Sequence, residues 1–332
     1  MPAIDRHHRR TALLALAGLA TLPLLARAQL PAPGVTGRVR FVGVEEGRSL
    51  IAGDDDWIQA TSDFQRAATL GAPPPVSRER LREFLATTVL PWPAEEESRW
   101  QAAVATAMAR IVALHLPVPP EVLLVNTDGR DAAGAPYTRG NAIFLPTRAL
   151  APRDGVPPDA FVIAHELFHV ISRKQPFLAN RLYALIGFQS VEALVWPIAW
   201  LPARIANPDA PLDRHAMRTT VEGREVWLMP VLVARRTELR PGETFFSVLD
   251  LRLLEVTVEP GRPTLPVMQG SAPAWHSPAQ APAYVARLGG NTGYILHPEE
   301  TIADNVALLV TGGPARNVQL LAEIEAVLTA PR

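Results

Sequence analysis

Hydrophobic positions recur with helical spacing in several parts of the chain. Between 94 and 115, apolar residues from Trp100 to Ile111 return every three or four positions, and Pro117 follows. This pattern predicts an amphipathic helix that ends before the proline. Segments of the same character predict three further helices, at 76–88, 298–311 and 319–328.

Short apolar runs bounded by glycine, proline or polar residues predict strands instead. These runs stand at 121–125, 140–146, 226–229, 245–249 and 251–256, and a proline-rich stretch at 260–282 predicts an irregular excursion or lid. No fixed-period repeat is present. The mixture of helices and strands therefore predicts an α+β fold.

One predicted helix combines an apolar surround with three ionisable residues. Pro157 and Pro158 end a loop, Asp159 is a suitable N-cap, and 160–171 is apolar except for a histidine–glutamate–histidine set. Buried charge is costly unless something binds it. The three residues form an H-E-x-x-H motif, His165, Glu166 and His169.

The four-residue spacing places both imidazoles on one face of the helix, where they can share one tetrahedral zinc ion. Glu166 lies beside them, in position to polarise a water molecule. A single buried histidine is more simply explained as a hydrogen-bonded core residue than as a metal ligand. That explanation fits poorly with two histidines four residues apart that have a glutamate between them. We therefore predict one Zn²⁺ per chain.

A catalytic zinc ion needs a third protein ligand, and the best candidate is Glu300. Asp304 lies one helical turn further on, where it can accept the second N–H of a ligand histidine. Glu192 is the runner-up because it is nearer to His169 in sequence, but Trp196 stands four residues after it. The plainer alternative to a ligand role is that Glu299 and Glu300 only stabilise the start of a helix, where carboxylates interact favourably with the helix dipole.

A hydrolytic site also needs a donor aimed at the developing negative charge. Tyr294 and His297 are the preferred pair because they are closest in sequence to the predicted ligand helix. His215 and Tyr183 are weaker candidates. His297 is equally suited to capping the helix.

The H-E-x-x-H motif followed by an E-x-x-x-D helix resembles the gluzincin, or thermolysin-like, group of zinc metallopeptidases. The resemblance implies a zincin-like core, a small sheet with an active-site helix, in which His165, His169 and Glu300 bind zinc. It also implies that Glu166 is the general base and that Asp304 orients a ligand. The chain departs from the group in its longer ligand spacing and in Glu299, where the group has asparagine.

Two further segments, 137–145 and 289–305, resemble exported bacterial proteins, which implies a divergent branch. In zincins the strand before the metal helix commonly lies at the sheet edge and pairs with the substrate. We therefore expect 140–146 at an edge. Residues 137–139 then either line the cleft or form a plain surface hairpin.

The N-terminus reads as an export signal. A basic run ending in Arg9-Arg10 precedes an apolar stretch at 11–25 and a small-x-small site, Ala26-Arg27-Ala28. The adjacent arginines resemble a twin-arginine signal, whereas the basic run alone also suits general secretion. We expect a periplasmic or secreted protein, without stable membrane insertion once a signal peptide at 1–28 is removed. The alternative is an uncleaved N-terminal anchor.

Composition narrows the function further. The net charge of −1 argues against a nucleic-acid surface, and the chain has no cysteine, so its stability must come from its core. The predicted function is an exported zinc metallopeptidase acting on a peptide or protein. The alternative is a catalytically silent zincin-like scaffold that binds a cell-envelope partner.

The predicted organisation after the signal peptide has four parts. They are an N-terminal helical region at 29–93, a zincin-like core with the H-E-x-x-H helix at 94–211, a β- and proline-rich insertion at 212–288, and C-terminal helices with the third metal ligand at 289–332.

Overall fold

The computed structural model of this protein describes residues 37–147 and 157–330, so the predicted signal peptide at 1–28 lies outside the described residues. Within these ranges α-helices and β-strands are mixed, which confirms the predicted α+β class. No helix among the described residues is long and apolar enough to cross a membrane.

The first sheet has four strands in the order β1-β2-β4-β3. Strands β1 (Arg38–Phe41), β2 (Glu121–Thr127) and β4 (Ala142–Pro146) run parallel, and β3 (Tyr137–Arg139) pairs antiparallel with β4. The expectation that 140–146 forms an edge strand is therefore wrong, because β3 takes the edge. Strand β3 is not a surface hairpin either, since all three of its residues are buried.

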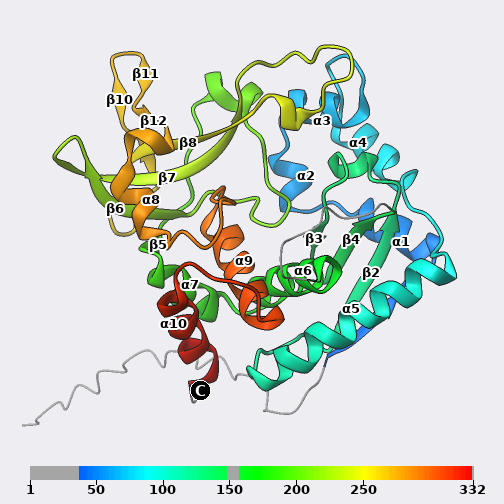
Figure 1. Ribbon diagram of the computed structural model, residues 1–332. Helices are drawn as coiled ribbons and strands as arrows, with labels where there is room; N and C mark the ends of the chain where they lie inside the picture. The colour runs from blue at the N-terminus through cyan, green and yellow to red at the C-terminus, as the bar shows by residue number, and fades with distance from the viewer. Residues whose placement is uncertain (1–36, 148–156, 331–332) are drawn as a thin grey trace, which may run out of the picture. The chain divides into compact units, whose positions relative to one another are not determined.

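Helices cover both faces of this sheet (Figure 1). Val122 and Leu124 pack with α5 (Ala94–Ala113) and α6 (Pro158–Lys174). The alternate residues Leu123 and Val125 pack against a second set of helices, because successive strand residues point to opposite faces. That set contains α1 (Val44–Ile51), α2 (Asp56–Ala60) and α4 (Arg78–Ala86), and α3 (Asp63–Leu70) packs on α4.

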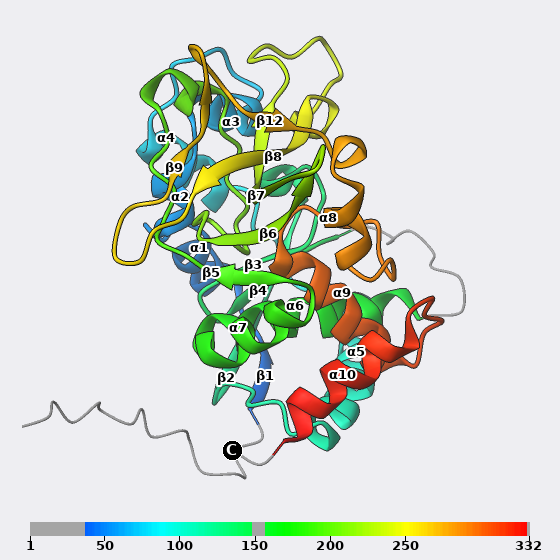
Figure 2. The ribbon, with the colours of Figure 1, turned by 90° about the vertical axis from the view of Figure 1, so that its left-hand side faces the viewer.

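The second sheet is antiparallel (Figure 2), and in the sequence its strands lie between α6 and the C-terminal helices. Its strand order is β12-β8-β7-β6-β5, with β9 paired to β8, and β10 and β11 form a separate hairpin. The bounds are β5 (Phe188–Ser190), β6 (His215–Val221), β7 (Arg224–Ala234), β8 (Leu249–Thr257), β9 (Leu265–Pro266), β10 (Met268–Gln269), β11 (Ala272–Pro273) and β12 (Trp275–His276).

One predicted strand in this region is wrong. Residues 245–249 begin instead as the 3-10 helix Phe245–Ser247, and β8 starts only at Leu249. The side chains of Thr244 and Ser247 explain the difference, because they form a capping box that closes a helical turn.

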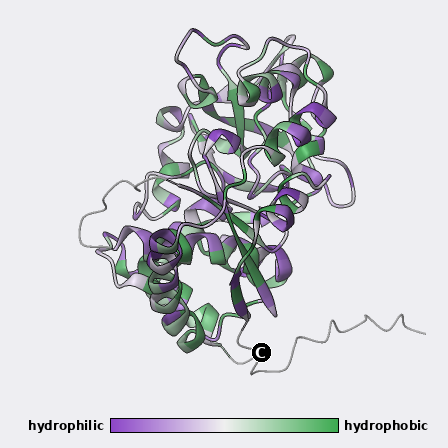
Figure 3. Cartoon of the chain, turned by 90° about the vertical axis from the view of Figure 1, so that its right-hand side faces the viewer, coloured by the Kyte–Doolittle hydropathy of each residue, from purple (hydrophilic) through white to green (hydrophobic). Residues whose placement is uncertain are grey.

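Four helices remain among the described residues, of which the first and third pack against α6. They are α7 (Pro176–Leu185), α8 (Pro282–Arg287), α9 (Pro298–Thr311) and α10 (Val318–Thr329). Helix α6 begins at Pro158, so Asp159 lies in its first turn and is not the N-cap; it pairs with Arg99 at 3.4 Å. Proline suits this first position because its fixed φ is already helical and it needs no N–H partner. In Figure 3 the inner strands are coloured mainly as hydrophobic, whereas the helices carry both colours.

We expect Arg139→Ala to destabilise the protein by about 2–4 kcal/mol, because it removes a buried cation from three acceptors. Arg139 donates to the Asp55 carboxylate at 2.6 Å and to the carbonyl oxygens of Ile51 and Gly53 at 2.5 Å each. Urea unfolding measures this change. The exposed Arg218→Ala is the matched control, and an equal effect of both variants would contradict a structural role for Arg139.

Candidate metal centre

Helices α6 and α9 lie against each other (Figures 1 and 2). Ionisable side chains of the two helices face each other. His165 and His169 project from one face of α6, with ring centroids 4.6 Å apart. Glu300 faces them from the first turn of α9, and its Oε2 lies 3.2 Å from His165 Nε2 and 3.5 Å from His169 Nε2. All three side chains are buried. The structure thus brings together the three residues predicted as metal ligands.

These donor atoms fit a tetrahedral divalent ion. Zinc ligands at about 2.0–2.1 Å from the ion lie about 3.3–3.4 Å from one another, close to the two distances measured here. One ligand atom from each of His165, His169 and Glu300 lies within 4.8 Å of the other two. His169 Nε2 is buried and has no hydrogen-bond partner among the described residues. Two imidazole nitrogens and one carboxylate oxygen are a donor set that zinc accepts.

The other ring nitrogen of each histidine meets a carboxylate. His165 Nδ1 lies 2.9 Å from Asp304 Oδ1, and His169 Nδ1 lies 2.7 Å from Glu299 Oε1. Such contacts fix the tautomer that leaves Nε2 available to a metal ion. Asp304 occupies the position predicted for it, and its Oδ2 accepts a hydrogen bond from Thr292 at 2.5 Å.

Glu299 was noted in the sequence only as a departure from the gluzincin pattern. Here its Oε1 also accepts from the hydroxyl of Ser172 at 2.5 Å, and its Oε2 accepts from the hydroxyl of Tyr183. Tyr183, a weaker candidate for stabilising an oxyanion, thus holds the carboxylate that orients His169. The adjacency of Glu299 to Glu300 on a first helical turn is the only sequence signal that could have indicated this role.

The ionisation states of the histidines and carboxylates in the centre depend on one another. Burial alone lowers the pKa of His165, but hydrogen bonds to Asp304 and Glu300 raise it to about 10 in the metal-free protein. Burial disfavours the ionised form of Glu300, yet the neighbouring imidazoles hold its pKa well below the usual value. Without a metal ion, protons on the histidines balance the carboxylates.

Glu166 lies next to His165 on α6 and is 4% exposed. Its Oε2 is buried and has no hydrogen-bond partner among the described residues. Burial, together with the carboxylate of Asp209, raises the pKa of Glu166 to about 8. A carboxylate with an unpartnered oxygen and a raised pKa has the properties of a general base or acid.

Two residues of the centre were not predicted. Asn207 Nδ2 donates to Glu300 Oε1 at 2.5 Å, and ligand atoms of Asp209, Glu166 and His169 all lie within 4.8 Å of one another. Both come from one turn between the 3-10 helix Ile198–Ala203 and β6. The Asn-Pro-Asp sequence indicates a turn, but nothing in its spacing connects that turn to α6.

Tyr294 and His297, the two residues predicted to stabilise an oxyanion, have different surroundings in the structure. The ring centroids of Tyr294 and His165 are 6.2 Å apart. Tyr294 is 42% exposed, and the negative charge of Glu300 is the main cause that raises its pKa well above 10. His297 is the N-cap of α9, where its Nδ1 accepts from the backbone N–H of Glu299 at 3.1 Å. Burial lowers the pKa of His297 to about 3, so its imidazole is neutral.

The other two candidates lie outside the donor set. His215 Nε2 lies 3.0 Å from Asn180 Oδ1, and its ring is 5.6 Å from that of His297. Glu192 is exposed and belongs to neither of the possible metal-ligand groups among the described residues. The geometry therefore favours Glu300 over Glu192 as the third ligand.

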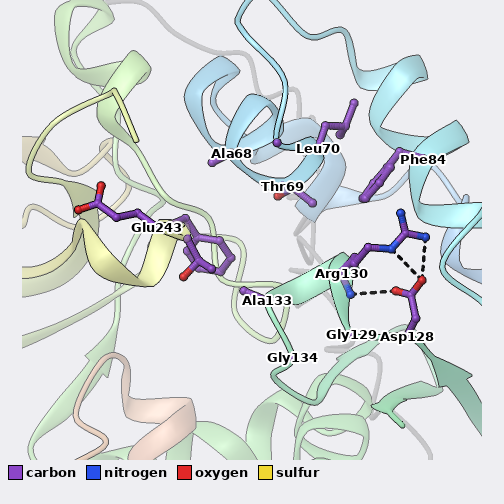
Figure 4. Close-up of a pocket in the computed structure, with 13 residues that line it drawn as sticks. Ala68, Thr69, Leu70, Phe84, Asp128, Gly129, Arg130, Ala133, Gly134 and Glu243 are labelled. Atoms are coloured by element: carbon purple, nitrogen blue, oxygen red, sulfur yellow. Dashed lines mark hydrogen bonds and ion pairs between the residues drawn. The ribbon is translucent and has the colours of Figure 1, made fainter. Parts of the chain in front are cut away.

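A cavity of about 70 Å³ adjoins the centre, because Asn207, Asp209 and Tyr294 line it. Its other walls are mainly apolar and include Trp57 and Phe246. A larger cavity, about 500 Å³, shares no residue with the centre (Figure 4). There Arg130 is held against Asp128, and we find no constellation of reactive groups among the lining residues of that cavity.

No family model, no curated protein and no solved structure matches this chain. The assignment of the centre therefore depends on its residues and their geometry.

We expect purified wild-type protein to hold about one zinc ion per chain, as a three-ligand site does. Glu300→Ala should lose the ion, because an N,N,O donor set is reduced to two nitrogens. Glu192→Ala should retain it. Elemental analysis of the three proteins side by side measures this, and loss of zinc from Glu192→Ala alone would reverse the assignment.

Zinc binding to metal-free protein at pH 7.5 should release about two protons, because a metal ion displaces them from imidazole. The pKa of His165 is raised from 6.5 to about 10, so the proton on it stabilises the metal-free fold fully below pH 6.5. That contribution is lost as the pH rises towards 10. Calorimetry in buffers of different ionisation enthalpy counts the protons. A heat independent of the buffer would show that the histidines are already neutral.

Proposed function

We propose that this chain is an exported zinc-dependent metallopeptidase with a zincin-like core. The observation that carries the proposal is the facing arrangement of α6 and α9. It combines an N,N,O donor set, a carboxylate on the second nitrogen of each histidine, and a buried glutamate, one oxygen of which has no hydrogen-bond partner in the described parts of the chain. A purely structural zinc site has four protein ligands and no need for such a base.

A zinc ion held by His165, His169 and Glu300 supplies a Lewis acid that polarises a carbonyl group and makes water more acidic. Asp304 and Glu299 keep the histidines in the tautomer that presents Nε2. Because both carboxylates are themselves hydrogen-bonded, the donor set is oriented before any substrate arrives.

Glu166 performs the proton transfers. Its Oε2 accepts a proton from the attacking water, whose oxygen bonds to the peptide carbonyl carbon. The same carboxyl group then gives the proton to the nitrogen as the carbon–nitrogen bond breaks. Tyr294 stays protonated because the surrounding carboxylates raise its pKa, so its hydroxyl is suited to donate to the negative charge that develops on the carbonyl oxygen.

Glu166→Gln should retain the metal ion and lose hydrolysis by about 10³-fold or more, because glutamine cannot accept the proton. The rate is measured on an unfolded protein or a fluorogenic peptide mixture, with metal content determined on the same samples. Glu323→Gln, exposed on α10, is the matched control.

Full activity in metal-loaded Glu166→Gln would end this mechanism. If the wild type holds zinc but cleaves none of the peptides, the leading account becomes the silent scaffold that binds a partner through the same surface.

A further inference from the structure

Asn207 contacts the predicted third ligand from outside the two ligand helices. Its Nδ2 donates to Glu300 Oε1 at 2.5 Å. The other oxygen of this carboxylate, Oε2, lies 3.2 Å from His165 Nε2 and 3.5 Å from His169 Nε2. The two oxygens of Glu300 therefore have different surroundings, because one faces the imidazoles and the other is held by an amide.

A second contact fixes the orientation of the Asn207 amide. Its Oδ1 accepts from the backbone N–H of Asp209 at 3.1 Å. An amide oxygen only accepts and an amide nitrogen only donates, so an N–H on one side and a carboxylate on the other determine which way the group points. Reversal of the amide would lose both hydrogen bonds and place its oxygen against the Glu300 carboxylate.

The residue before Asn207 is anchored to the N-terminal helices. The backbone of Ala206 exchanges two hydrogen bonds with the Gln65 side chain, at 2.8 and 2.9 Å, and its carbonyl oxygen also accepts from Trp57 Nε1 at 3.1 Å. All three of these residues are buried. The backbone that leads into Asn207 is therefore held from the side of α2 and α3.

The chain after Asn207 is anchored to the edge strand β3. Asp209 Oδ1 accepts from the backbone N–H of Thr138 at 2.7 Å and from its hydroxyl at 2.6 Å. Because the backbone is held on both sides of Asn207, its amide reaches Glu300 from a fixed position in the fold.

A neutral donor suits a carboxylate that has to bind a cation. The amide of Asn207 supplies a hydrogen bond without a positive charge, so Glu300 keeps the negative charge that attracts a metal ion. An arginine or a lysine at the same place would form a charge-assisted pair with the carboxylate and would compete with the ion for it.

We propose that Asn207 is a positioning residue of the metal centre, which holds Oε1 so that Glu300 binds the ion through Oε2 alone. A carboxylate can bind a metal ion through one oxygen or through both. With Oε1 engaged by the amide, Glu300 contributes one ligand atom, and the set that it forms with His165 and His169 keeps a coordination position for water. This inference rests on the metal centre of the proposed function.

The test measures the zinc affinity of Asn207→Leu and Asn207→Asp beside that of the wild type, in the whole chain after the predicted signal peptide. Leucine is close to asparagine in shape and removes the donor without adding charge, whereas aspartate removes the donor and repels Glu300. Both variants should bind zinc about 10–100-fold more weakly than the wild type. Asn141→Asp is the matched control and should keep the wild-type affinity, because the amide of Asn141 donates to the carbonyl oxygen of Glu121 at 3.0 Å and not to a metal ligand.

The visible absorption of the Co²⁺ protein separates positioning from a general loss of stability. In Asn207→Leu the freed Oε1 of Glu300 is able to join Oε2 on the ion. At saturating Co²⁺ the absorption bands should then shift and weaken, because they lose intensity as the coordination number rises. A loss of stability alone lowers the fraction of folded protein and leaves the shape of the bands unchanged.

The outcomes separate this inference from the proposed peptidase activity. Wild-type zinc affinity together with an unchanged Co²⁺ spectrum in folded Asn207→Leu overturns the role of Asn207 and leaves the peptidase proposal standing. If Asn207→Leu does not fold, wild-type zinc affinity in Asn207→Asp overturns that role, because aspartate keeps an acceptor for the N–H of Asp209. Weaker zinc binding and an altered spectrum, in a protein whose wild type cleaves no peptide, support the role of Asn207 and remove the peptidase. A wild type that binds no metal ion removes both.

Discussion

The contact between α6 and α9 buries ionisable side chains on faces of the two helices that are otherwise apolar. Each buried charge needs a partner of opposite charge or a hydrogen bond, and this need determines how the centre is arranged. Two histidines and three carboxylates of these helices, together with Glu166, are all below 10% exposed. An uncompensated charge at such depth costs several kcal/mol. Most of these groups have such a partner, since the imidazoles contact carboxylates and the carboxylates accept hydrogen bonds from hydroxyl groups. Within the described residues, His169 Nε2 and Glu166 Oε2 are buried without a hydrogen-bond partner. Our proposal places a cation and a reacting water at these two atoms.

The two sheets serve this contact in different ways. The first sheet, with helices on both faces, fixes α6 against a broad core, so the histidines project from a rigid element. The second sheet fills the long stretch of chain between the two ligand helices, and the turn at 207–209 enters the centre from the connection that leads into it. Arg173 on α6 joins the two parts by donating to Thr138 on β3 and to the carbonyl of Asp209.

Local signals explain what could be predicted. The i, i+4 histidines and the Glu300–Asp304 pair share helical faces by periodicity alone, and the bounds of α5 and α9 follow from Pro117, Pro298 and Gly312. The parts that sequence could not provide depend on contacts between distant segments. Nothing local distinguishes β3 from β4 as the edge strand, or shows that Asp209 bonds to Thr138, and the capping box at Thr244 opposes an apolar strand pattern. The role of Glu299 depended on knowing which face of α9 meets His169.

The order of the ligands along the chain has a further consequence for stability. A metal ion bound by His169 and Glu300 closes a loop that contains the whole second sheet, in a chain that has no cysteine. Loop closure restricts the unfolded chain, and for a cross-link spanning about 100 residues the entropy model gives about 4–5 kcal/mol. The proposed ion would thus act as a cross-link in a chain that has no disulfide bond. Without that ion, only packing and hydrogen bonds such as those from Thr138 and Arg173 to Asp209 would hold the second sheet and its connections against the rest of the fold.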